Sequence, residues 1–375
     1  MGLHCIVHCD DLLKAVSAQQ NITNKKGNMA ILSHILVEAK DNQLVCTGTD
    51  LEIGLKQTIP AEVVEPGAVA LPAKKLFELA RESGGADIAL KEDDKAWVDI
   101  EAGPGRYRLA GMDAAEFPQF PGYKEEALAP VEAAALIELI DKTAFAIATD
   151  KETVLALTAA LLQKHEENGE PRLKMVTSDG HRLCIMSRKA GDISGLNIGP
   201  NVLIPRRGVQ EIRKFGENQD SVLLGVEDNQ IVLKEKDNLL IIRLMKGEFP
   251  DFAALLSNIT PDKTVGMERM RLLEALKRMN LFTEDISHAI KISLSRDSIT
   301  LNSQHTEYGS ATDSFAVQYD GEDIELAFNC RYFIDTMQVM EGETVQAAIK
   351  DEKSPCLISS LQDEGFLSVI MPMKL

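Results

Sequence analysis

The sequence predicts an α+β protein built from three repeated modules, each with two helices packed on antiparallel sheets. Two observations predict this class. The chain has 375 residues, enough for two or three domains of roughly 100–200 residues each. It also repeats one pattern over a long range, in which a helix with apolar residues at i, i+3 and i+4 precedes alternating strands. The expected modules span residues 1–127, 128–257 and 258–375.

The repeat places two helices in each module. The expected helical windows are 9–20, 73–82, 132–143, 206–216, 268–279 and 331–340. Glu116-Phe117-Pro118 and Glu248-Phe249-Pro250 recur near the ends of the first two modules, and turn formers mark seams at 122–130 and 257–261. A repeat of about 125 residues is too long for a solenoid unit, so we expect three copies of one domain.

The net charge is −18, from 40 Lys+Arg against 58 Asp+Glu. Spread evenly, this charge would repel nucleic acid. The six helical windows together carry +3, however, so the remainder of the chain carries −21. Two interpretations stay open: the helices carry Lys and Arg for helix propensity and solubility, or they line a surface that faces phosphates. Aromatic residues make up only 5% of the chain, which disfavours a stacking platform for single strands.

The sequence also indicates a cellular location. No apolar run approaches the roughly 18 residues that a membrane helix requires, and the first residues lack the features of a secretory signal. The six scattered cysteines are typical of reduced thiols. We therefore expect an intracellular, cytoplasmic protein with no membrane partner.

Sequence motifs for catalysis are missing. The run His4-Cys5-Ile6-Val7-His8-Cys9 suggests a metal cluster, but in a strand its like residues would lie about 13 Å apart, too far for one zinc ion. We expect an edge strand of the first module there, and no metal. Phosphate-binding loops, nucleophile elbows and His-Glu-x-x-His motifs do not occur in the sequence. Ser178-Asp179-Gly180-His181 cannot form a triad, because triad members come from separate elements; it is expected to be a turn between two strands. The sequence predicts a binding protein without catalytic residues or cofactor.

Seven motifs, in order along the whole chain, resemble the family of bacterial DNA polymerase III β subunits, the sliding clamps. These motifs are Thr47–Glu52, Glu116–Pro118, Ser178–Leu183, Ile204–Gly208, Gly247–Asp251, Phe328-Asn329 with Tyr332, and Val369–Leu375. The resemblance implies a clamp fold that closes as a head-to-tail homodimer, with helices around a central hole and sheets outside. It implies a non-catalytic processivity factor of the polymerase III holoenzyme, which holds double-stranded DNA through phosphates without reading sequence.

The resemblance further implies a hydrophobic cleft between the second and third domains. This cleft would bind short linear motifs of the polymerase III α subunit, the clamp loader, other polymerases and repair proteins. Residues that map to the cleft are Leu157, Ser178, Gly180, His181, Arg182, Leu183, Pro250, Leu255, Asn329, Tyr332, Val369, Ile370, Met371, Pro372, Met373, Lys374 and Leu375.

Two more sets of residues follow from the resemblance. Residues that map to DNA-facing positions are Lys26, Lys74, Arg206 and Arg207, while Lys14, Arg213, Lys214, Lys277 and Arg278 are candidates only because they lie on the expected helices. The family closes its ring between the first and third domains. Candidates for that contact are Leu281 and Phe282 on one side, and Lys75, Arg106 and Arg108 on the other.

The chain departs from the family pattern at two places. Val154–Ala159 stands where the family often has Arg-Tyr-Tyr-Leu-Asn-Gly, so an aromatic pair that can reach DNA is absent and only Leu157 carries over. Ala253-Ala254 replaces commonly basic residues, so the rim of the cleft is less basic and its motif preference is expected to differ. Two alternatives stay open: a metal- or nucleotide-dependent enzyme, which would need a catalytic cluster, and a clamp paralogue encoded beside a resident clamp, which only genomic context would distinguish.

Overall fold

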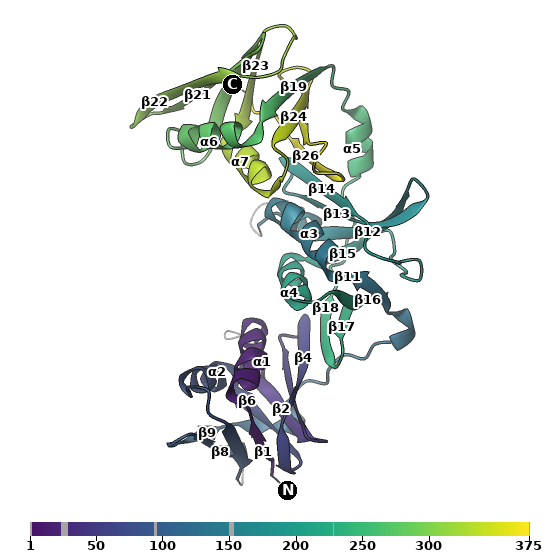
Figure 1. Cartoon of the computed structure of the whole chain (residues 1–375), viewed down its shortest axis with the longest axis vertical. Coiled ribbons are helices and arrows are strands. Elements are labelled where there is room, and N and C mark those ends of the chain that lie inside the picture. The colour runs from purple at the N-terminus through teal and green to yellow at the C-terminus, as the bar shows by residue number, and fades with distance from the viewer. Residues whose placement is uncertain (1, 24–28, 94–95, 150–153, 228, 375) are drawn as a thin grey trace. The chain divides into compact units, whose positions relative to one another are not determined.

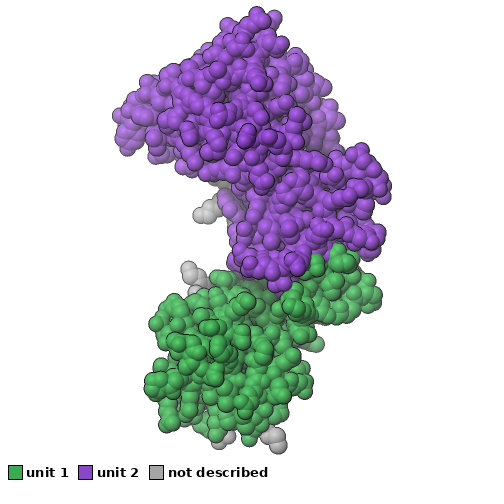
Figure 2. Space-filling view, in the orientation of Figure 1, with its two compact units in different colours: residues 1–130, 221–243 green, residues 131–220, 244–375 purple. Residues whose placement is uncertain are grey.

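The computed structural model describes residues 2–23, 29–93, 96–149, 154–227 and 229–374 (Figure 1). The chain packs as two compact units (Figure 2): unit 1 comprises residues 1–130 and 221–243, and unit 2 comprises residues 131–220 and 244–375. The units do not follow the three predicted modules, because the last strands of the second module pack with the first. The module seams after residues 127 and 257 stay predictions.

All six expected helices form close to their predicted windows. They are α1 (Cys9–Ile22), α2 (Ala73–Glu82), α3 (Ala133–Thr143), α4 (Arg206–Gly216), α6 (Arg269–Asn280) and α7 (Cys330–Val339). In α6, for example, Leu272, Leu276 and Met279 are buried on one face, at the spacing that amphipathic helices show. No helix among the described residues is long and apolar enough to cross a membrane.

One further helix, α5 (Phe252–Asn258), was not predicted. The Asp251 side chain caps it by accepting a hydrogen bond from the Ala254 N–H at 2.9 Å. None of its residues is fully buried, so its seven residues give little periodic signal in the sequence.

Unit 1 contains a five-stranded sheet. In spatial order its strands are β5 (Glu62–Glu65), β1 (His4–Val7), β7 (Ile88–Glu92), β8 (Trp97–Ala102) and β9 (Gly105–Ala110). The prediction that His4–Cys9 forms an edge strand was wrong, because β5 covers the outer side of β1 and Cys9 already begins α1. Burial raises the pKa of the Cys5 thiol to about 11. Among the described residues, no group of His, Cys, Asp and Glu side chains could hold a metal ion.

The second sheet that contributes to unit 1 has nine strands. In spatial order its strands are β10 (Met112–Asp113), β6 (Gly67–Pro72), β2 (His34–Lys40), β3 (Gln43–Thr49), β4 (Ile53–Pro60), β18 (Asn238–Arg243), β17 (Gln230–Glu235), β16 (Ser221–Glu227) and β11 (Ala129–Glu132). Helix α1 packs against α2 and lies on β3 and β4. Side chains from both helices and both sheets form one core, which includes Leu12, Leu76 and Ile100.

Unit 2 repeats this arrangement with two sheets. The eight-stranded sheet has the order β15 (Val202–Pro205), β12 (Ala159–Glu167), β13 (Glu170–Ser178), β14 (Arg182–Arg188), β26 (Phe366–Ile370), β25 (Cys356–Ser359), β24 (Thr344–Ile349) and β19 (Lys263–Glu268). The four-stranded sheet has the order β22 (Gly309–Ala316), β21 (Ser298–His305), β20 (Ala289–Ser295) and β23 (Ile324–Asn329). Helices α3 and α4 pack together, with α3 on β13 and β14 and α4 on β12 and β15. Helices α6 and α7 also pack together, with α6 on β21 and β22 and α7 on β26.

Strand pairing joins each module to the next in the same way. Strand β4 of the first module pairs antiparallel with β18 of the second, and β14 of the second pairs antiparallel with β26 of the third. By the same repeat, the corresponding strand of the third module is β22, and the strand of the first module that would receive it is β9. Both are edge strands of their sheets, so one side of each presents backbone groups that another chain can pair with. The predicted α+β class, with two helices per module on antiparallel sheets, is confirmed.

Candidate functional site

The turn between β13 and β14 is fixed by its own side chains, as predicted. The Ser178 hydroxyl donates to the Arg182 carbonyl at 2.7 Å and accepts from the Gly180 N–H at 3.1 Å. One Asp179 carboxylate oxygen accepts from the His181 and Arg182 N–H groups, both at 3.0 Å. Gly180 has a φ of +88°, a conformation that glycine adopts readily. The turn is therefore rigid, and its Ser and Asp are occupied by backbone groups.

An apolar cluster lies beside this turn. Leu183 of β14 and Val369 of β26 are register partners within it. Its buried members are Ala156, Ala159, Leu161, Val176, Leu183, Ile185, Leu203 and Val369, and the partly buried side chains packed on them are Met245, Phe249, Phe252, Leu256, Ile259, Leu357 and Leu367. Leu255 and Met371 are exposed to 37% and 36%. An apolar surface with half-exposed aromatic residues can receive apolar side chains of a ligand.

Arg182 holds the turn, an adjacent helix and two aromatic rings together. Its side chain is only 9% exposed and donates to the carboxylates of Asp179 at 2.9 Å and Asp335 at 2.7 Å. Its guanidinium lies over the rings of Tyr332 at 4.5 Å and Phe145 at 5.0 Å. Burial pulls the pKa of Arg182 down, but the hydrogen bond to Asp335 and the charge of Asp179 outweigh it and raise the pKa above its ordinary value. Arg182 is thus a positioning residue with its charge already paired.

The C-terminal residues leave the sheet after Ile370. The Met371 N–H donates to the His181 carbonyl at 2.9 Å, and the Met373 N–H donates to the Ala327 carbonyl of β23 at 2.8 Å. The tail is therefore held at both the turn and the four-stranded sheet. Leu375 lies outside the described residues.

The structure brings most of the predicted cleft residues to this one region. Leu157 is buried, and a Cβ on Gly180 would lie 3.9 Å from its side chain. Asn329 instead uses its side-chain oxygen to cap α7 through the Arg331 N–H at 2.9 Å. Sequence reasoning missed Asp335, although its position three residues after Tyr332 on a helix places both on one face.

The aromatic residues Phe145, Phe249 and Phe252 were also missed as site residues. Phe145 supplies a ring and its carbonyl, 3.0 Å from a guanidinium nitrogen, to Arg182. Phe249 and Phe252 meet edge to face with ring centroids 6.4 Å apart. The sequence signal that could have identified Phe249 and Phe252 is the motif Gly247–Asp251, which repeats residues 116–118.

The residues predicted to face DNA lie at the starts of helices. Lys74 is in the first turn of α2, and Arg206 and Arg207 are in the first turn of α4; neither turn contains an acidic residue. All three side chains are exposed. A cation at a helix N-terminus adds to the positive end of the helix dipole. At the start of α2 this charge is partly offset, because Lys74 lies 3.6 Å from Glu78. Lys26 lies outside the described residues.

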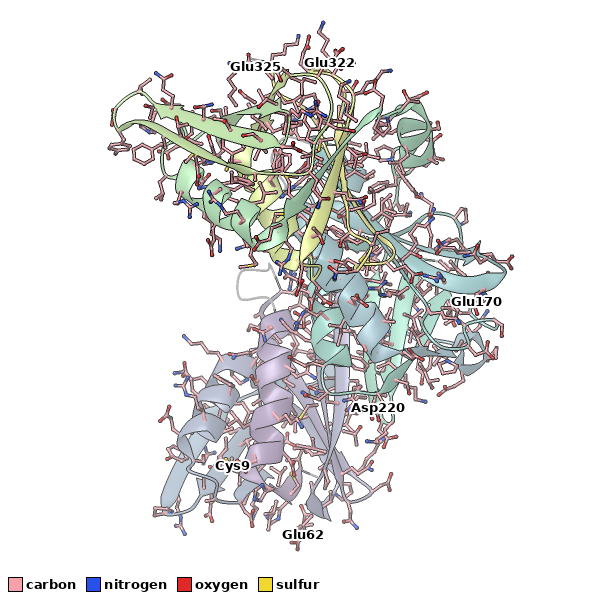
Figure 3. The ribbon with its side chains drawn as sticks, turned by 45° about the horizontal axis from the view of Figure 1, so that its top comes forward. Cys9, Glu62, Glu170, Asp220, Glu322 and Glu325 are labelled. Atoms are coloured by element: carbon pink, nitrogen blue, oxygen red, sulfur yellow. The ribbon has the colours of Figure 1, made fainter. Side chains whose placement is uncertain are left out.

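Several weaker DNA-facing candidates are already paired with carboxylates. Arg213 lies 2.6 Å from Asp141, and Lys214 lies 2.7 Å from Glu211. Arg278 lies 2.6 Å from Asp313. Acidic side chains such as Glu62, Glu170, Glu322 and Glu325 project outward from strand ends and turns (Figure 3).

Two of the residues predicted for ring closure lie on an edge strand, and three lie on or just after a helix. Arg106 and Arg108 belong to β9 and lie 3.3 Å from Glu101 and 2.6 Å from Asp93. Lys75, on α2, lies 2.8 Å from Glu78. Leu281 follows α6 and is 71% exposed, and Phe282 is half-buried. An exposed leucine of this kind is a candidate contact for another chain.

Family models match along nearly the whole chain. The DNA polymerase III beta subunit N-terminal domain matches residues 3–121, its central domain matches residues 130–251, and its C-terminal domain matches residues 260–374.

Individual relatives give the same result. The beta sliding clamp of Caulobacter vibrioides is 30% identical over 366 residues, 97% of each chain. That of Chlamydia muridarum is 29% identical over 374 residues, 99% of this chain and 98% of the relative. The crystal structure of the Caulobacter crescentus sliding clamp matches with a TM-score of 0.92 at 30% identity, and that of the Pseudomonas aeruginosa clamp bound to griselimycin with 0.91 at 26% identity; both comparisons cover 100% of both chains.

Proposed function

This chain belongs to the DNA polymerase III beta subunit family, the beta sliding clamps, and from that premise we propose where it holds peptides, DNA and its second copy. It is a non-catalytic processivity factor for the replicative polymerase, which works as a ring dimer on DNA with clamp-binding proteins. We also propose which residues form each of these sites, and that the protein is cytoplasmic and associated with the nucleoid.

The peptide site is the apolar cluster beside the turn 178–182. The observation that carries this proposal is the pair of half-exposed rings, Phe249 and Phe252, packed over a buried apolar cluster that includes Leu183 and Val369. An extended peptide would seat apolar anchors against it. Arg182 would orient the turn and the Tyr332 ring, and would not supply a free charge to the peptide, because Asp179 and Asp335 already neutralise it.

The experiment is titration of a fluorescent clamp-motif peptide against exposed-position variants. The double variant Leu255→Ser, Met371→Ser should weaken binding by about 10- to 100-fold, since losses of this size are typical of interface anchors. Leu255 lies on α5 beside the cluster members Phe252 and Leu256, and the Met371 N–H is bonded to the turn at His181. Leu361→Ser is the matched control, because Leu361 is 90% exposed and is not among the residues predicted for the cleft. Equal affinity in all three proteins would place the peptide site elsewhere.

Each unit supplies its own DNA-facing position, at the start of α2 in unit 1 and at the start of α4 in unit 2. Replacing Lys74 and Arg206 with Ala should reduce the slope of log affinity against log salt by up to ~0.9 per lost phosphate contact. Gel filtration should still give a dimer. An unchanged salt slope would show that these residues face away from the duplex.

Ring closure uses β22 of one copy and β9 of the other, as β4–β18 and β14–β26 do within the chain. Light scattering should then report twice the 41.2 kDa chain mass. The change Leu281→Asp should shift the protein toward monomer, because an unpaired charge in an interface is costly. A dimer unaffected by this change would exclude Leu281 from the contact.

A further inference from the structure

The turn at 178–182 has a counterpart in the first module. The Thr49 hydroxyl donates to the Ile53 carbonyl at 2.9 Å and accepts from the Leu51 N–H at 2.9 Å, as Ser178 does with Arg182 and Gly180. One Asp50 carboxylate oxygen accepts from the N–H groups of residues 52 and 53, at 3.0 and 2.8 Å. The two turns have the same hydrogen bonds at equivalent positions.

The strands beside the two turns also correspond. Gly54 is the register partner of Ile241, as Leu183 is of Val369. The Arg243 N–H donates to the Glu52 carbonyl at 2.8 Å, which is the bond that Met371 makes to His181.

The chain segments 116–120 and 248–252 correspond as well. Glu116-Phe117-Pro118 repeats Glu248-Phe249-Pro250, and Phe120 stands where the second module has Phe252. The Phe120 ring packs so closely on β4 that a Cβ on Gly54 would lie 2.8 Å from it. The same components that surround the proposed peptide site are therefore assembled a second time in unit 1.

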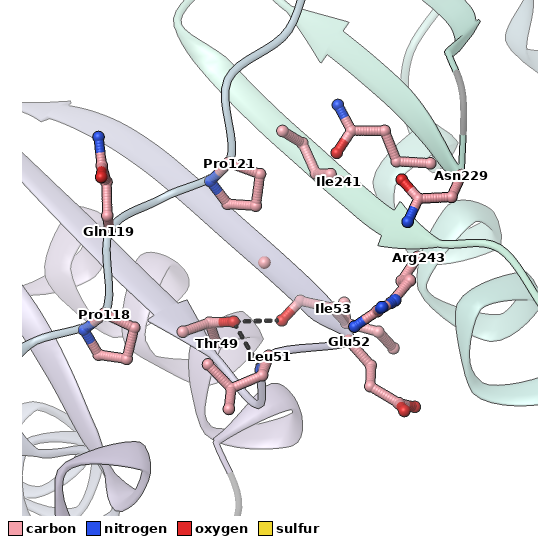
Figure 4. A pocket seen from close by; sticks show the side chains of 12 residues that line it. Thr49, Leu51, Glu52, Ile53, Pro118, Gln119, Pro121, Asn229, Ile241 and Arg243 are labelled. Carbon is pink, nitrogen blue, oxygen red and sulfur yellow. Dashed lines mark hydrogen bonds between the residues drawn. The ribbon is translucent and has the colours of Figure 1, made fainter.

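We propose that this second assembly is a docking site for a partner-protein segment that carries a bulky apolar side chain next to a carboxylate. A cavity of about 230 Å³ lies there (Figure 4). Its lining residues are Thr49, Leu51, Glu52, Ile53, Gly54, Pro118, Gln119, Pro121, Asn229, Gln230, Ile241 and Arg243. The volume corresponds to about eight waters at ~30 Å³ each, which is room for one large side chain and a carboxylate.

The apolar part of this chemistry comes from Leu51. Leu51 occupies the position of Gly180 but has a φ of +75°, a left-handed conformation that costs a non-glycine residue energy. Its side chain is nevertheless 52% exposed at the cavity instead of buried in the core. The neighbouring walls are Ile53, Ile241 and the rigid rings of two prolines. An apolar ligand side chain would cover Leu51.

The carboxylate preference comes from Arg243, which replaces Met371 of the other site. Among the described residues, no carboxylate lies within 4.0 Å of the Arg243 guanidinium, in contrast to Arg182 with its two carboxylate partners. Figure 4 shows the guanidinium directed toward the loop at 51–53 and the Glu52 carboxylate turned away from it. A charge-assisted hydrogen bond to a ligand carboxylate would satisfy this guanidinium.

The inference rests on the proposed peptide site only through the analogy between the two turns. The test therefore measures binding at the two sites separately. Methyl-labelled dimer would be titrated with the peptide acetyl-Gly-Phe-Glu-Gly-amide and with its neutral counterpart, acetyl-Gly-Phe-Gln-Gly-amide. The methyl signals of Leu51, Ile53 and Ile241 report the new site, and those of Leu157 and Leu183 report the site in unit 2. We expect saturable shifts at the first set, with the neutral peptide binding about tenfold more weakly.

The variant Arg243→Gln should make the two peptides equal in affinity. Arg81→Gln is the matched control, because Arg81 is an exposed arginine of unit 1 outside the cavity. Absence of shifts at Leu51, Ile53 and Ile241 in a protein with an otherwise unchanged spectrum would overturn the inference. Equal affinity of both peptides for the unaltered protein would overturn it too, as would the same shifts from inorganic phosphate alone, which would indicate a simple anion site. A clamp-motif peptide that fails to shift Leu157 and Leu183 would count against the proposed function alone.

Discussion

The two strand junctions of the chain, β4–β18 and β14–β26, begin at turns with the same hydrogen bonds. The buried polar groups that hold each junction to its helix differ, however. In unit 1 the group is an amide: Gln19 of α1 is fully buried and donates to the carbonyls of Cys46 at 3.0 Å and Leu55 at 3.1 Å. It ties the helix to β3 and β4. A neutral amide costs less to bury than an ion does.

In unit 2 the buried group is an ion pair. Lys142 of α3 donates to both carboxylate oxygens of Asp363, at 2.7 and 2.8 Å, with side-chain exposures of 4% and 1%. Asp363 lies in the connection between β25 and β26, so the pair joins the second module to the third. Substitutions should therefore destabilise the two junctions by different amounts. Loss of the Gln19 amide leaves two carbonyls without a donor, whereas loss of one ion leaves the opposite buried charge without its closest partner.

The largest expected effect comes from removing one partner of this ion pair. Lys142→Met would leave the buried Asp363 carboxylate without its closest partner, with the Arg188 guanidinium remaining at 3.8 Å. We expect the unfolding free energy to fall by up to about 3–5 kcal/mol. Urea denaturation of the purified protein would measure the loss.

The double variant Lys142→Met, Asp363→Leu is the control. It removes both charges, so most of the stability should return. A double variant as unstable as the single one would show that lost packing, and not the stranded charge, is responsible.

A smaller loss is expected at the buried amide of unit 1, Gln19. Gln19→Leu would leave the side-chain hydrogen bonds to two carbonyls unmade, at a cost of about 1–3 kcal/mol by the same measurement. The Gln19 carbonyl oxygen has no hydrogen-bond partner among the residues that the structure describes, so removing it costs nothing further. A loss as large as that of Lys142→Met would contradict the distinction between amide and ion.

The two turns should be equivalent in stability but not in binding. Thr49→Ala and Ser178→Ala each remove two side-chain hydrogen bonds and should each cost about 1–2 kcal/mol. Only Ser178→Ala should weaken a clamp-motif peptide. If Thr49→Ala weakened that peptide equally, the effect would be a general loss of rigidity.

The repeated helices and the turn at 178–182 could be predicted from the sequence, because periodic apolar residues and the Ser-Asp-Gly run are local signals. The placement of β1 could not, since its outer partner β5 is a short strand with mostly polar ends. Contacts such as Arg182 with Asp335 join residues 153 positions apart and carry no local signal. The pairing of Lys142 with Asp363 was equally invisible, because a lone lysine in a helix is ordinarily a surface residue.

The smallest effect is expected at the third junction strand, β22, which in the described part of the chain pairs with β21 alone. Asp313 of β22 accepts hydrogen bonds from Arg271 and Arg278 of α6, at 2.7 and 2.6 Å, and these bonds lower the pKa of its carboxyl from 3.8 to about 2. A carboxyl whose pKa is lowered by folding stabilises the protein above its unfolded pKa, and this contribution is lost as the pH falls from about 4 to about 2. The ion pairs are partly exposed, so the contribution should not exceed about 1 kcal/mol. Denaturation midpoints measured against pH should therefore fall more steeply below pH 4 for the unaltered protein than for Asp313→Asn, and the two curves should run parallel above pH 5. Parallel curves throughout would mean that solvent screens the pair and that β22 is held on α6 by apolar packing alone.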